Sequence, residues 1–342
     1  MRSKSIEGAE ILVPASIANL GPGFDTLAVA VQLYLRVRVV EARNDGRQEL
    51  EFRFVDQTLK GENYIERAFR FLARKSGKTE FPSLKCEVRT EIPMQAGLGS
   101  SAAATVAGLR LFEAISAPVS LNDLFNASCE LEGHPDNVAA AVYGGLTGSC
   151  QLSDGSVIAV PFRWPEQIVF LVLTPELGLE TAKARKALPQ LLSREDAVFN
   201  LQRVVLLLQA LQSGDHHLLR EALRDKWHQP FREMLVPGLE QALALHHPDL
   251  LGVCLSGAGP SIAAMAEKKN VPVVEEILSR SYASTGIPFR IRALQVHQSA
   301  AAATGAAEGS HGFRSTSNVH GSSQTGELLA GGTKGVSHTV SG

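Results

Sequence analysis

The sequence has little net charge and few aromatic residues, which limits what this protein can bind. Its 33 Lys and Arg residues nearly balance 35 Asp and Glu residues, for a formal charge of −2. We therefore expect no global attraction for nucleic acid or for an anionic membrane, so any ligand must be recognised locally. Aromatic residues make up 6% and hydrophobic residues 44% of the 342 residues. This composition suits an aliphatic core of α/β type, and the length favours two domains.

Cysteines and long apolar runs are also scarce. Cys86, Cys129, Cys150 and Cys254 are widely separated and include no CxxC pair. This spacing excludes a metal finger, and we expect buried free thiols in a reducing compartment. No apolar run approaches the roughly 18 residues that span a bilayer, and the N-terminal residues contain no apolar signal-peptide core. These absences predict a cytoplasmic protein with neither a membrane nor a nucleic-acid partner.

The most informative stretch, residues 92–104, reads IPMQAGLGSSAAA. It follows residues 84–92, where apolar and charged side chains alternate as in a half-buried strand, and it leads into an alanine-rich helix pattern. A helix start carries unpaired amides and a partial positive charge, so a glycine loop leading into one suits phosphate. No Gly-Lys-Ser/Thr follows the glycines, which excludes a Walker A loop, and the spacing is not GxGxxG. We expect Ser100 or Ser101 to cap the helix; the alternative interpretation of the stretch is an ordinary glycine turn.

Two further loops of small residues lie far from this stretch in the sequence. Residues 13–25 read VPASIANLGPGFD, and residues 254–261 read CLSGAGPS. Three such loops in this order, with PxxxGLGSSAA in the second, resemble the GHMP kinases from about residue 11 to residue 296. The resemblance implies an α+β fold: a ribosomal-protein-S5-domain-2-like nucleotide-binding domain over residues 1–163 and a ferredoxin-like C-terminal domain over residues 164–297.

The patterns along the chain agree with such a fold. They predict strands over residues 27–41 and 168–173, and helices over 64–75, 121–131, 195–212 and 218–227. Residues 142–152 and 157–162 read as a hairpin around Asp154-Gly155. Residues 298–342 consist largely of Ala, Gly, Ser, Thr and His. We expect them to form a low-complexity, disordered tail, to which we assign no role.

The resemblance also implies a kinase with ATP and Mg²⁺ as cofactors. The implied ATP-binding residues are Pro93, Met94, Gln95, Ala96, Gly97, Leu98, Gly99, Ser100, Ser101, Ala102, Gly257 and Gly259. Magnesium prefers hard oxygen ligands and takes only one or two from the protein, and the implied ligands are Ser101 and a glutamate before His134. Glu130 and Glu132 both lie there, two positions apart on a helix, so only one can face the metal. We choose Glu132, and the choice against Glu130 stays open.

Within the family, residues 131–138, LEGHPDNV, resemble the substrate segment of homoserine kinases, and two arginine segments, residues 180–189 and 228–238, agree with this. Arg185 and Arg232 are implied to bind the carboxylate of an amino-acid substrate, because a guanidinium offers two parallel donors. Asp25 is implied to accept from its ammonium group, with Asn19 and His134 completing the hydrogen bonds. Asp136 and Asn137 are predicted to position the substrate hydroxyl, since a carboxylate near cations is a poor base but a good acceptor.

The implied reaction is ATP-dependent phosphorylation of L-homoserine to O-phospho-L-homoserine, a step of threonine biosynthesis. One alternative is a GHMP kinase for another small alcohol such as mevalonate. Another is a ligand-sensing homologue without turnover, because a fold alone does not determine function. A homodimer is the family expectation and stays open.

Overall fold

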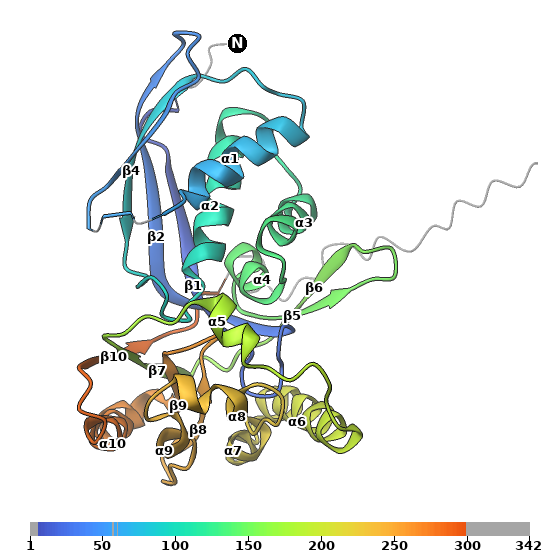
Figure 1. The fold of residues 1–342 in the computed structure, drawn as a ribbon, viewed down its shortest axis with the longest axis vertical. Coiled ribbons are helices and arrows are strands. Elements are labelled where there is room, and N and C mark those ends of the chain that lie inside the picture. The colour runs from blue at the N-terminus through green and yellow to red at the C-terminus, as the bar shows by residue number, and fades with distance from the viewer. Residues whose placement is uncertain (1–5, 57, 60, 299–342) are drawn as a thin grey trace, which may run out of the picture. The chain divides into compact units, whose positions relative to one another are not determined.

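The structure is a computed structural model that describes residues 6–298 except residues 57 and 60. The predicted tail therefore lies outside the described residues from residue 299 onward. The described chain forms two sheets with their helices, the first sheet from the N-terminal part of the sequence and the second from the C-terminal part (Figure 1).

The first sheet is built around one long strand. Its strands are β1 (Glu10–Ala18), β2 (Leu27–Arg43), β3 (Leu50–Phe54), β4 (Ser83–Thr90), β5 (Leu146–Gln151) and β6 (Val157–Phe162), in the order β3-β4-β2-β5-β6 with β1 also paired to β2. Along β2, Leu33, Leu35, Val37 and Val39 are buried, whereas the residues between them are exposed or half-buried. The predicted alternation is therefore confirmed.

Helices cover the buried face of this sheet (Figure 1). They are α1 (Tyr64–Lys75), α2 (Ser100–Ile115), α3 (Leu121–Glu132) and α4 (Asp136–Tyr143). Asn63 and Ser120 accept hydrogen bonds from the first-turn amides of α1 and α3, and Gly133 ends α3 in a left-handed conformation with φ of 77°. These are the ordinary start and stop signals of helices, which is why sequence patterns located α1 and α3 closely.

The second sheet is antiparallel throughout. It contains β7 (Ile168–Pro175), β8 (Leu250–Leu255), β9 (Ile262–Glu267) and β10 (Phe289–Leu294) in the order β10-β7-β9-β8. Numbered in chain order the strands run 4-1-3-2, which is the ferredoxin-like arrangement that was expected. All of β7 is buried because alternate residues belong to different cores: Phe170 and Val172 to the large core, Leu171 and Leu173 to a second cluster.

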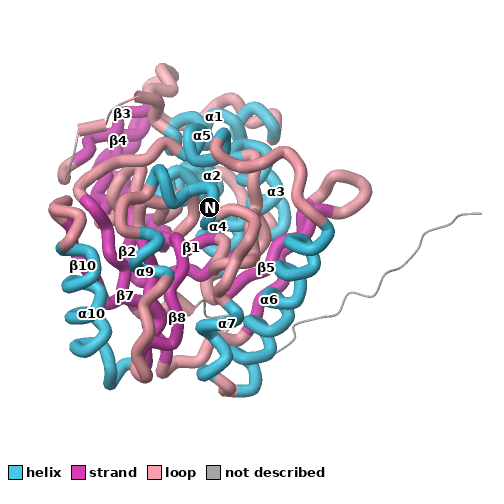
Figure 2. Tube along the Cα trace, turned by 60° about the horizontal axis from the view of Figure 1, so that its bottom comes forward, coloured by secondary structure: helices cyan, strands magenta, loops and turns pink. Residues whose placement is uncertain are grey.

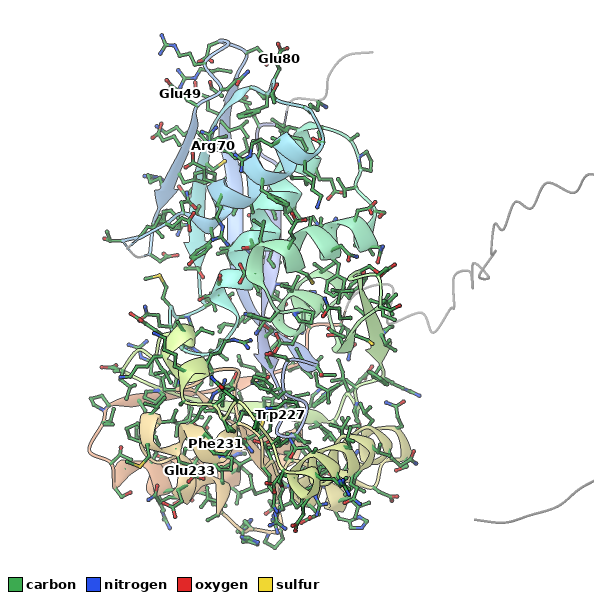
Figure 3. All side chains as sticks on the ribbon, turned by 45° about the vertical axis from the view of Figure 1, so that its right-hand side comes forward. Glu49, Arg70, Glu80, Trp227, Phe231 and Glu233 are labelled. Carbon is green, nitrogen blue, oxygen red and sulfur yellow. The ribbon has the colours of Figure 1, made fainter. Side chains whose placement is uncertain are left out.

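The helices of the C-terminal part are mostly short. They are α5 (Thr181–Lys186), α6 (Arg194–Ser213), α7 (Leu219–Ala222), α8 (Gln229–Arg232), α9 (Leu239–Leu243) and α10 (Val271–Ala283), with 3₁₀ turns at His216–Leu218, Glu233–Leu235 and Lys268–Asn270. Helices α9 and α10 pack on the second cluster, and α7 packs against β8 (Figure 2). Trp227, Phe231 and Glu233, around α8, lie in the same half of the described chain as the second sheet (Figure 3).

Three sequence-based expectations were wrong. Residues 136–143 form a helix that ends at Gly144, so the hairpin begins at Leu146 rather than at residue 142. The helix expected over 218–227 ends at Ala222, because the carboxylate of Asp225 binds the amides of the next residues, Trp227 at 2.8 Å and His228 at 2.9 Å. Cys150 is exposed and Cys129 half-buried, although all four thiols are free and Cys86 and Cys254 are buried as expected. No helix of the described chain is long and apolar enough to cross a bilayer.

Candidate active site

The loop before α2 presents free amides at the helix start. The N-cap of α2 is Gly99, with φ of 69°, so the expectation that Ser100 or Ser101 caps the helix was wrong. Both serines lie in the first helical turn instead, because the left-handed glycine already begins the helix. Among the described residues no acceptor binds the amides of Gly97, Gly99, Ser100 and Ser101. Convergent unpaired amides at a helix N-terminus form a site for an anion.

Four consecutive carbonyl groups of the same loop, those of residues 95–98, are bound to protein donors, which fixes the direction of the amides between them. The four hydrogen bonds are Leu179 N to Gln95 O at 3.0 Å, Ser261 N to Ala96 O at 3.2 Å, Ser256 Oγ to Gly97 O at 2.7 Å, and Ser16 N to Leu98 O at 3.2 Å. The donors come from strand β1 in the segment of residues 13–25, from the loop of residues 254–261 and from the segment before α5. The three loops that are distant in sequence are therefore joined in the structure.

The close approach of these segments explains why positions 97 and 99 are glycine: no space is left there for a side chain. A Cβ atom at Gly97 would lie 2.3 Å from Ser256 O, and one at Gly99 would lie 2.1 Å from Ser16 Oγ. Not every implied nucleotide-binding residue faces outward: Ala96, Leu98 and Ala102 are buried in the core, Pro93 is half-buried, and Met94 and Gln95 are exposed. The buried three can contribute only through their backbone. A Cβ atom at Gly259 would lie 3.0 Å from the side chains of Leu255 and Val236, and one at Gly97 would lie 2.7 Å from Gly259 O.

Glu132 faces the start of α2, whereas Glu130 does not. The Glu132 carboxylate accepts hydrogen bonds from Ser101 Oγ at 3.0 Å and Thr105 Oγ1 at 2.6 Å, and Arg67 Nη2 lies 3.6 Å from it. The Glu132 side chain is 5% exposed. Glu130 is 54% exposed and pairs with Lys75 on the surface. Of the two glutamates, only Glu132 is placed to share a cation with Ser101.

Asp136 and Asn137 lie on the first turn of α4 rather than on a loop. The buried Asp136 carboxylate binds His134 Nδ1 at 2.9 Å and the Asn137 amide at 2.7 Å. Burial alone would raise the pKa of Asp136, but the hydrogen bond and charge of His134 and the Asn137 amide outweigh it and lower the pKa. Burial alone would lower the pKa of His134, but the hydrogen bond and charge of Asp136 outweigh burial and raise the pKa. Asn137 Oδ1 accepts from Ser16 Oγ at 2.7 Å, which ties α4 to strand β1.

Arg232 is a buried cation without a carboxylate partner. It is 2% exposed, and it has no ion pair with any described residue. Its Nη1 donates to Gly257 O at 2.9 Å and lies 3.2 Å from His228 Nδ1. Burial, together with the charge of Arg185, lowers the pKa of Arg232 to about 10. A buried guanidinium that forms no ion pair favours binding of an anion.

Two of the predicted substrate residues, Arg185 and Arg232, lie near the ring of Phe24. The guanidinium carbons of Arg185 and Arg232 are 5.6 Å and 5.5 Å from its centre. Arg185 forms two hydrogen bonds with Asp25, and these raise the pKa of Arg185. The buried Asn19 donates to Gly257 O at 2.9 Å and accepts from the Asp25 amide at 3.1 Å. Its amide group thus stabilises the loops in this structure.

Sequence reasoning missed Ser16, Phe24, Thr105 and His228. Thr105 follows Ser101 by four residues on the same helix, so the spacing of the helix carried a signal for it. Phe24 and His228 lie inside segments that were singled out for other residues. Ser16 also lies inside a segment that was singled out, residues 13–25, but its pairing with Asn137 carried no local signal because the two residues are 121 positions apart.

Comparisons with known proteins bear on this arrangement. Residues 63–145 match the model of the GHMP kinases N terminal domain, and residues 207–284 match that of the GHMP kinases C terminal region. The chain is 40% identical over 267 residues to a homoserine kinase of Solibacter usitatus, covering 77% of this chain and 86% of the relative. It is also 40% identical over 270 residues to a homoserine kinase of Thermus thermophilus, covering 78% of this chain and 90% of the relative.

Solved structures share the fold. The crystal structure of homoserine kinase from Cytophaga hutchinsonii has a TM-score of 0.75 at 24% identity, covering 87% of this chain and 98% of that chain. The crystal structure of L. major mevalonate kinase in complex with R-mevalonate has a TM-score of 0.62 at 17% identity, covering 87% of this chain and 99% of that chain. At these identities both show the fold alone. The fold expected from the sequence is confirmed.

Proposed function

We propose that this chain, which belongs to the homoserine kinase family of the GHMP kinases, phosphorylates the side-chain hydroxyl of L-homoserine. The products are O-phospho-L-homoserine and ADP, and the reaction serves threonine biosynthesis. Family membership makes the chain a kinase with a small-molecule substrate. The choice of L-homoserine is supported by two relatives named homoserine kinase, which are 40% identical to this chain over most of their length. The mevalonate kinase is only 17% identical to this chain.

One residue carries the proposal because it touches both halves of the site. The carbonyl of Gly257 accepts from Arg232 Nη1 and from Asn19 Nδ2, each at 2.9 Å. A Cβ atom at Gly257 would lie 3.0 Å from the carbonyl oxygen of Gly97 in the loop before α2. The amides that suit nucleotide phosphates and the arginine that suits a carboxylate are therefore neighbours, as transfer between two bound molecules requires.

The loop before α2 would hold the phosphates of ATP. Phosphoryl transfer needs little covalent chemistry from the protein, and it depends on positioning and on stabilising spread negative charge. The amides of Gly97, Gly99, Ser100 and Ser101 supply fixed donors for that charge without a Walker A lysine. Their direction is preorganised because the carbonyls on the other side of the loop are already bound to protein.

Ser101 and Glu132 fit a magnesium ion. Magnesium usually takes one or two protein oxygens and completes its shell with phosphate oxygens and waters. The Ser101 hydroxyl and the Glu132 carboxylate are 3.0 Å apart; the Glu132 side chain is 5% exposed and Ser101 is half-buried. No cluster of three or more His, Cys, Asp or Glu ligands occurs in the described part of the chain, which agrees with such a sparse site. When bound, the ion would neutralise charge on the nucleotide phosphates.

The substrate would be held by its two charges. We propose that Arg232 and Arg185 bind the carboxylate and that Asp25 accepts from the ammonium group. Arg232 is buried without a counter-ion, so a substrate carboxylate would supply the missing charge. His134 and Asn19 lie next to these residues and would complete the hydrogen bonds to the amino acid.

Asp136 and Asn137 would orient the attacking hydroxyl. The lowered pKa of Asp136, set by His134 and the Asn137 amide against the effect of burial, makes its carboxylate a weak general base. Both oxygen-bearing side chains are held by neighbours, Asp136 by His134 and Asn137 by Ser16. We therefore infer that positioning, more than proton abstraction, is their role.

A coupled ADP-release assay tests the function. We expect turnover with L-homoserine that clearly exceeds turnover with D-homoserine, L-threonine and mevalonate. Equal rates with mevalonate and L-homoserine would contradict the substrate assignment. Absence of ADP release with every alcohol would favour the ligand-sensing alternative. We also propose that the two domains divide between residues 163 and 164. We further propose that the protein acts in the cytoplasm.

A further inference from the structure

Arg232 is held by the protein on one side of its guanidinium. Nη1 binds Gly257 O at 2.9 Å and lies 3.2 Å from His228 Nδ1, while Nε lies 3.4 Å from Ala184 O. No acceptor among the described residues binds Nη2. In the proposed function, Nη2 is thus the donor that is left for a substrate carboxylate. Its direction depends on what holds Nη1.

The surroundings of His228 determine which of its nitrogens accepts. Nε2 lies 2.7 Å from Gly21 O, and a carbonyl oxygen can only accept, so Nε2 carries the hydrogen. Nδ1 of the neutral ring then carries a lone pair and accepts from Arg232. Complete burial favours this neutral form and lowers the pKa of His228; Arg232 acts in the same direction, and the carboxylates of Asp225 and Asp25 act in the opposite one.

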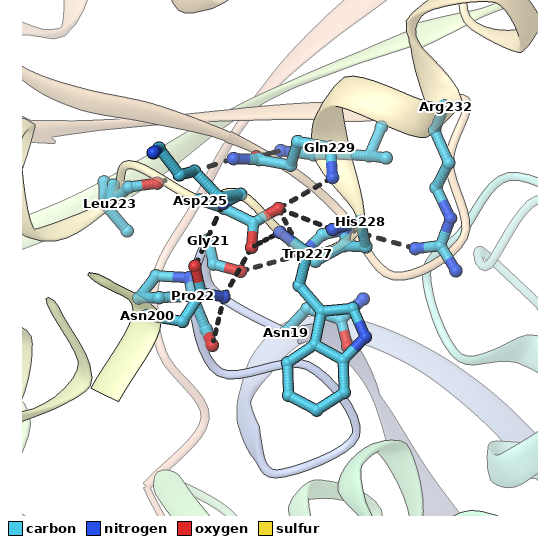
Figure 4. Close-up of polar contacts among 12 residues, drawn as sticks. Asn19, Gly21, Pro22, Asn200, Leu223, Asp225, Trp227, His228, Gln229 and Arg232 are labelled. Atoms are coloured by element: carbon cyan, nitrogen blue, oxygen red, sulfur yellow. Dashed lines mark hydrogen bonds and ion pairs between the residues drawn. The ribbon is translucent and has the colours of Figure 1, made fainter. Parts of the chain in front are cut away.

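Asp225 fixes the backbone that carries His228. Its fully buried carboxylate accepts from the amides of Trp227, His228 and Gln229 at 2.8, 2.9 and 2.7 Å (Figure 4). It also accepts from Asn200 Nδ2 at 2.7 Å, which lies 3.3 Å from Pro22 O as well. The imidazole and its carbonyl partner on the first glycine loop are therefore held by one network.

We infer that His228 is a positioning residue for the substrate carboxylate: its Nδ1 accepts from Arg232 Nη1 and so directs Nη2 toward the substrate. The inference rests on the proposed function, in which Arg232 binds that carboxylate. His228 itself touches no substrate. Its loss should weaken substrate binding through Arg232 while leaving the nucleotide loop intact.

Two variants separate the acceptor at Nδ1 from the donor at Nε2. In His228→Gln an amide can still donate to Gly21 O, but no acceptor remains near Nδ1. In His228→Asn the side-chain oxygen can replace Nδ1, but the bond to Gly21 is lost. For L-homoserine we expect His228→Gln to raise KM about tenfold, the effect of one hydrogen bond to a charged group, and His228→Asn to raise it less than about threefold. KM for ATP and kcat should stay near wild type in both.

Thermal unfolding of both variants provides the matched control. A purely structural role would make the rise in KM follow the loss of Tm, whichever nitrogen is replaced, and that result would overturn the inference. An unchanged KM in His228→Gln would overturn it as well. If the wild-type protein prefers mevalonate over L-homoserine, the proposed function fails, and the same KM comparison with that carboxylate substrate still decides the role of His228.

Discussion

Asp25 and Arg185, 160 positions apart, form a two-pronged ion pair, with Nη1 to Oδ2 at 2.8 Å and Nη2 to Oδ1 at 2.7 Å. The two residues were predicted to bind opposite ends of a zwitterionic substrate. In this structure the Asp25 carboxylate binds Arg185 where a substrate carboxylate would bind, and the Arg185 guanidinium binds Asp25 where the substrate ammonium group would bind. Binding of an amino acid would therefore exchange one ion pair for two. A ligand with a single charge would leave Asp25 or Arg185 without a partner.

This relationship predicts how Asp25→Asn changes substrate preference. The variant loses the acceptor for the ammonium group, so KM for L-homoserine should rise about tenfold. It also frees Arg185, so 4-hydroxybutyrate, which has the carboxylate and hydroxyl but no ammonium group, should become a better substrate than it is for wild type. The ADP-release assay with both substrates measures the two opposite changes.

A surface pair of the same kind serves as the control. Glu276 and Arg280 pair on α10 with side chains 61% and 79% exposed, and Glu276→Gln should leave both KM values unchanged. If Asp25→Asn weakened both substrates equally, the ion pair would be a structural contact rather than a competitor of the substrate.

The contrast between two glutamates predicts a metal-dependent effect. Glu132→Gln keeps the shape of the side chain but removes the charge beside Ser101, so kcat should fall about 100-fold and the Mg²⁺ concentration for half-maximal rate should rise. Glu130→Gln, which removes a carboxylate of the same helix that pairs with Lys75, should leave both quantities unchanged. The measurement is the rate as a function of Mg²⁺ at saturating ATP. A larger effect in Glu130→Gln would reverse the assignment.

Local patterns predicted the fold better than the contacts within the site. Helix α1 was predicted at its observed bounds, 64–75, because its amphipathic pattern and flanking residues are all local. Position 99 was harder: either serine was a reasonable cap by residue type. The left-handed backbone of Gly99 and the lack of space for a side chain beside Ser16 appear only in the structure. Helix α4 was read partly as strand because its short alanine and valine run has no clear period.

The contacts between loops could not be predicted because they depend on the order of strands in the sheets. Gly257 lies next to Gly97 because β9 pairs with β7 and β8 pairs with β9, which fixes the position of the loop between β8 and β9. The same holds for Asp225: its sequence neighbours suggested a continuing helix, and its acceptance of several backbone amides requires that it be buried beside Asn200. Residue types thus indicated the chemistry of the site, and sheet topology decided which residues share it.

Gly97 is predicted to be intolerant of a side chain for two separable reasons. Its φ of 75° is unfavourable for alanine, and a Cβ atom would lie 2.3 Å from Ser256 O. Gly214, with φ of 83° and nothing within 4 Å of its Cβ position, shares only the first reason. Gly214→Ala should cost about 1 kcal/mol of unfolding free energy, and Gly97→Ala about 1–3 kcal/mol more. Denaturant unfolding measures both.

The activity of these two variants distinguishes stability from loop geometry. Displacement of the loop at Gly97 would misdirect the amides before α2, so KM for ATP should rise in Gly97→Ala and stay unchanged in Gly214→Ala. Equal KM values in the two variants would show that the loop does not hold the nucleotide.

The pair of His134 and Asp136 predicts a dependence of stability on pH. The pKa of His134 is raised above its ordinary value near 6.5, because the hydrogen bond and charge of Asp136 outweigh burial. A group with a raised pKa in the folded state stabilises fully below its unfolded pKa, and that contribution disappears as the pH rises through the folded value. The Tm of wild type should therefore exceed that of His134→Gln by a few degrees near pH 6, and the difference should shrink by pH 9. His246→Gln, at an exposed histidine whose Nδ1 lies 2.8 Å from Ala244 O, is the matched surface control. A difference for His134→Gln that grew with pH would mean that the neutral imidazole, not the imidazolium, stabilises the fold beside Asp136.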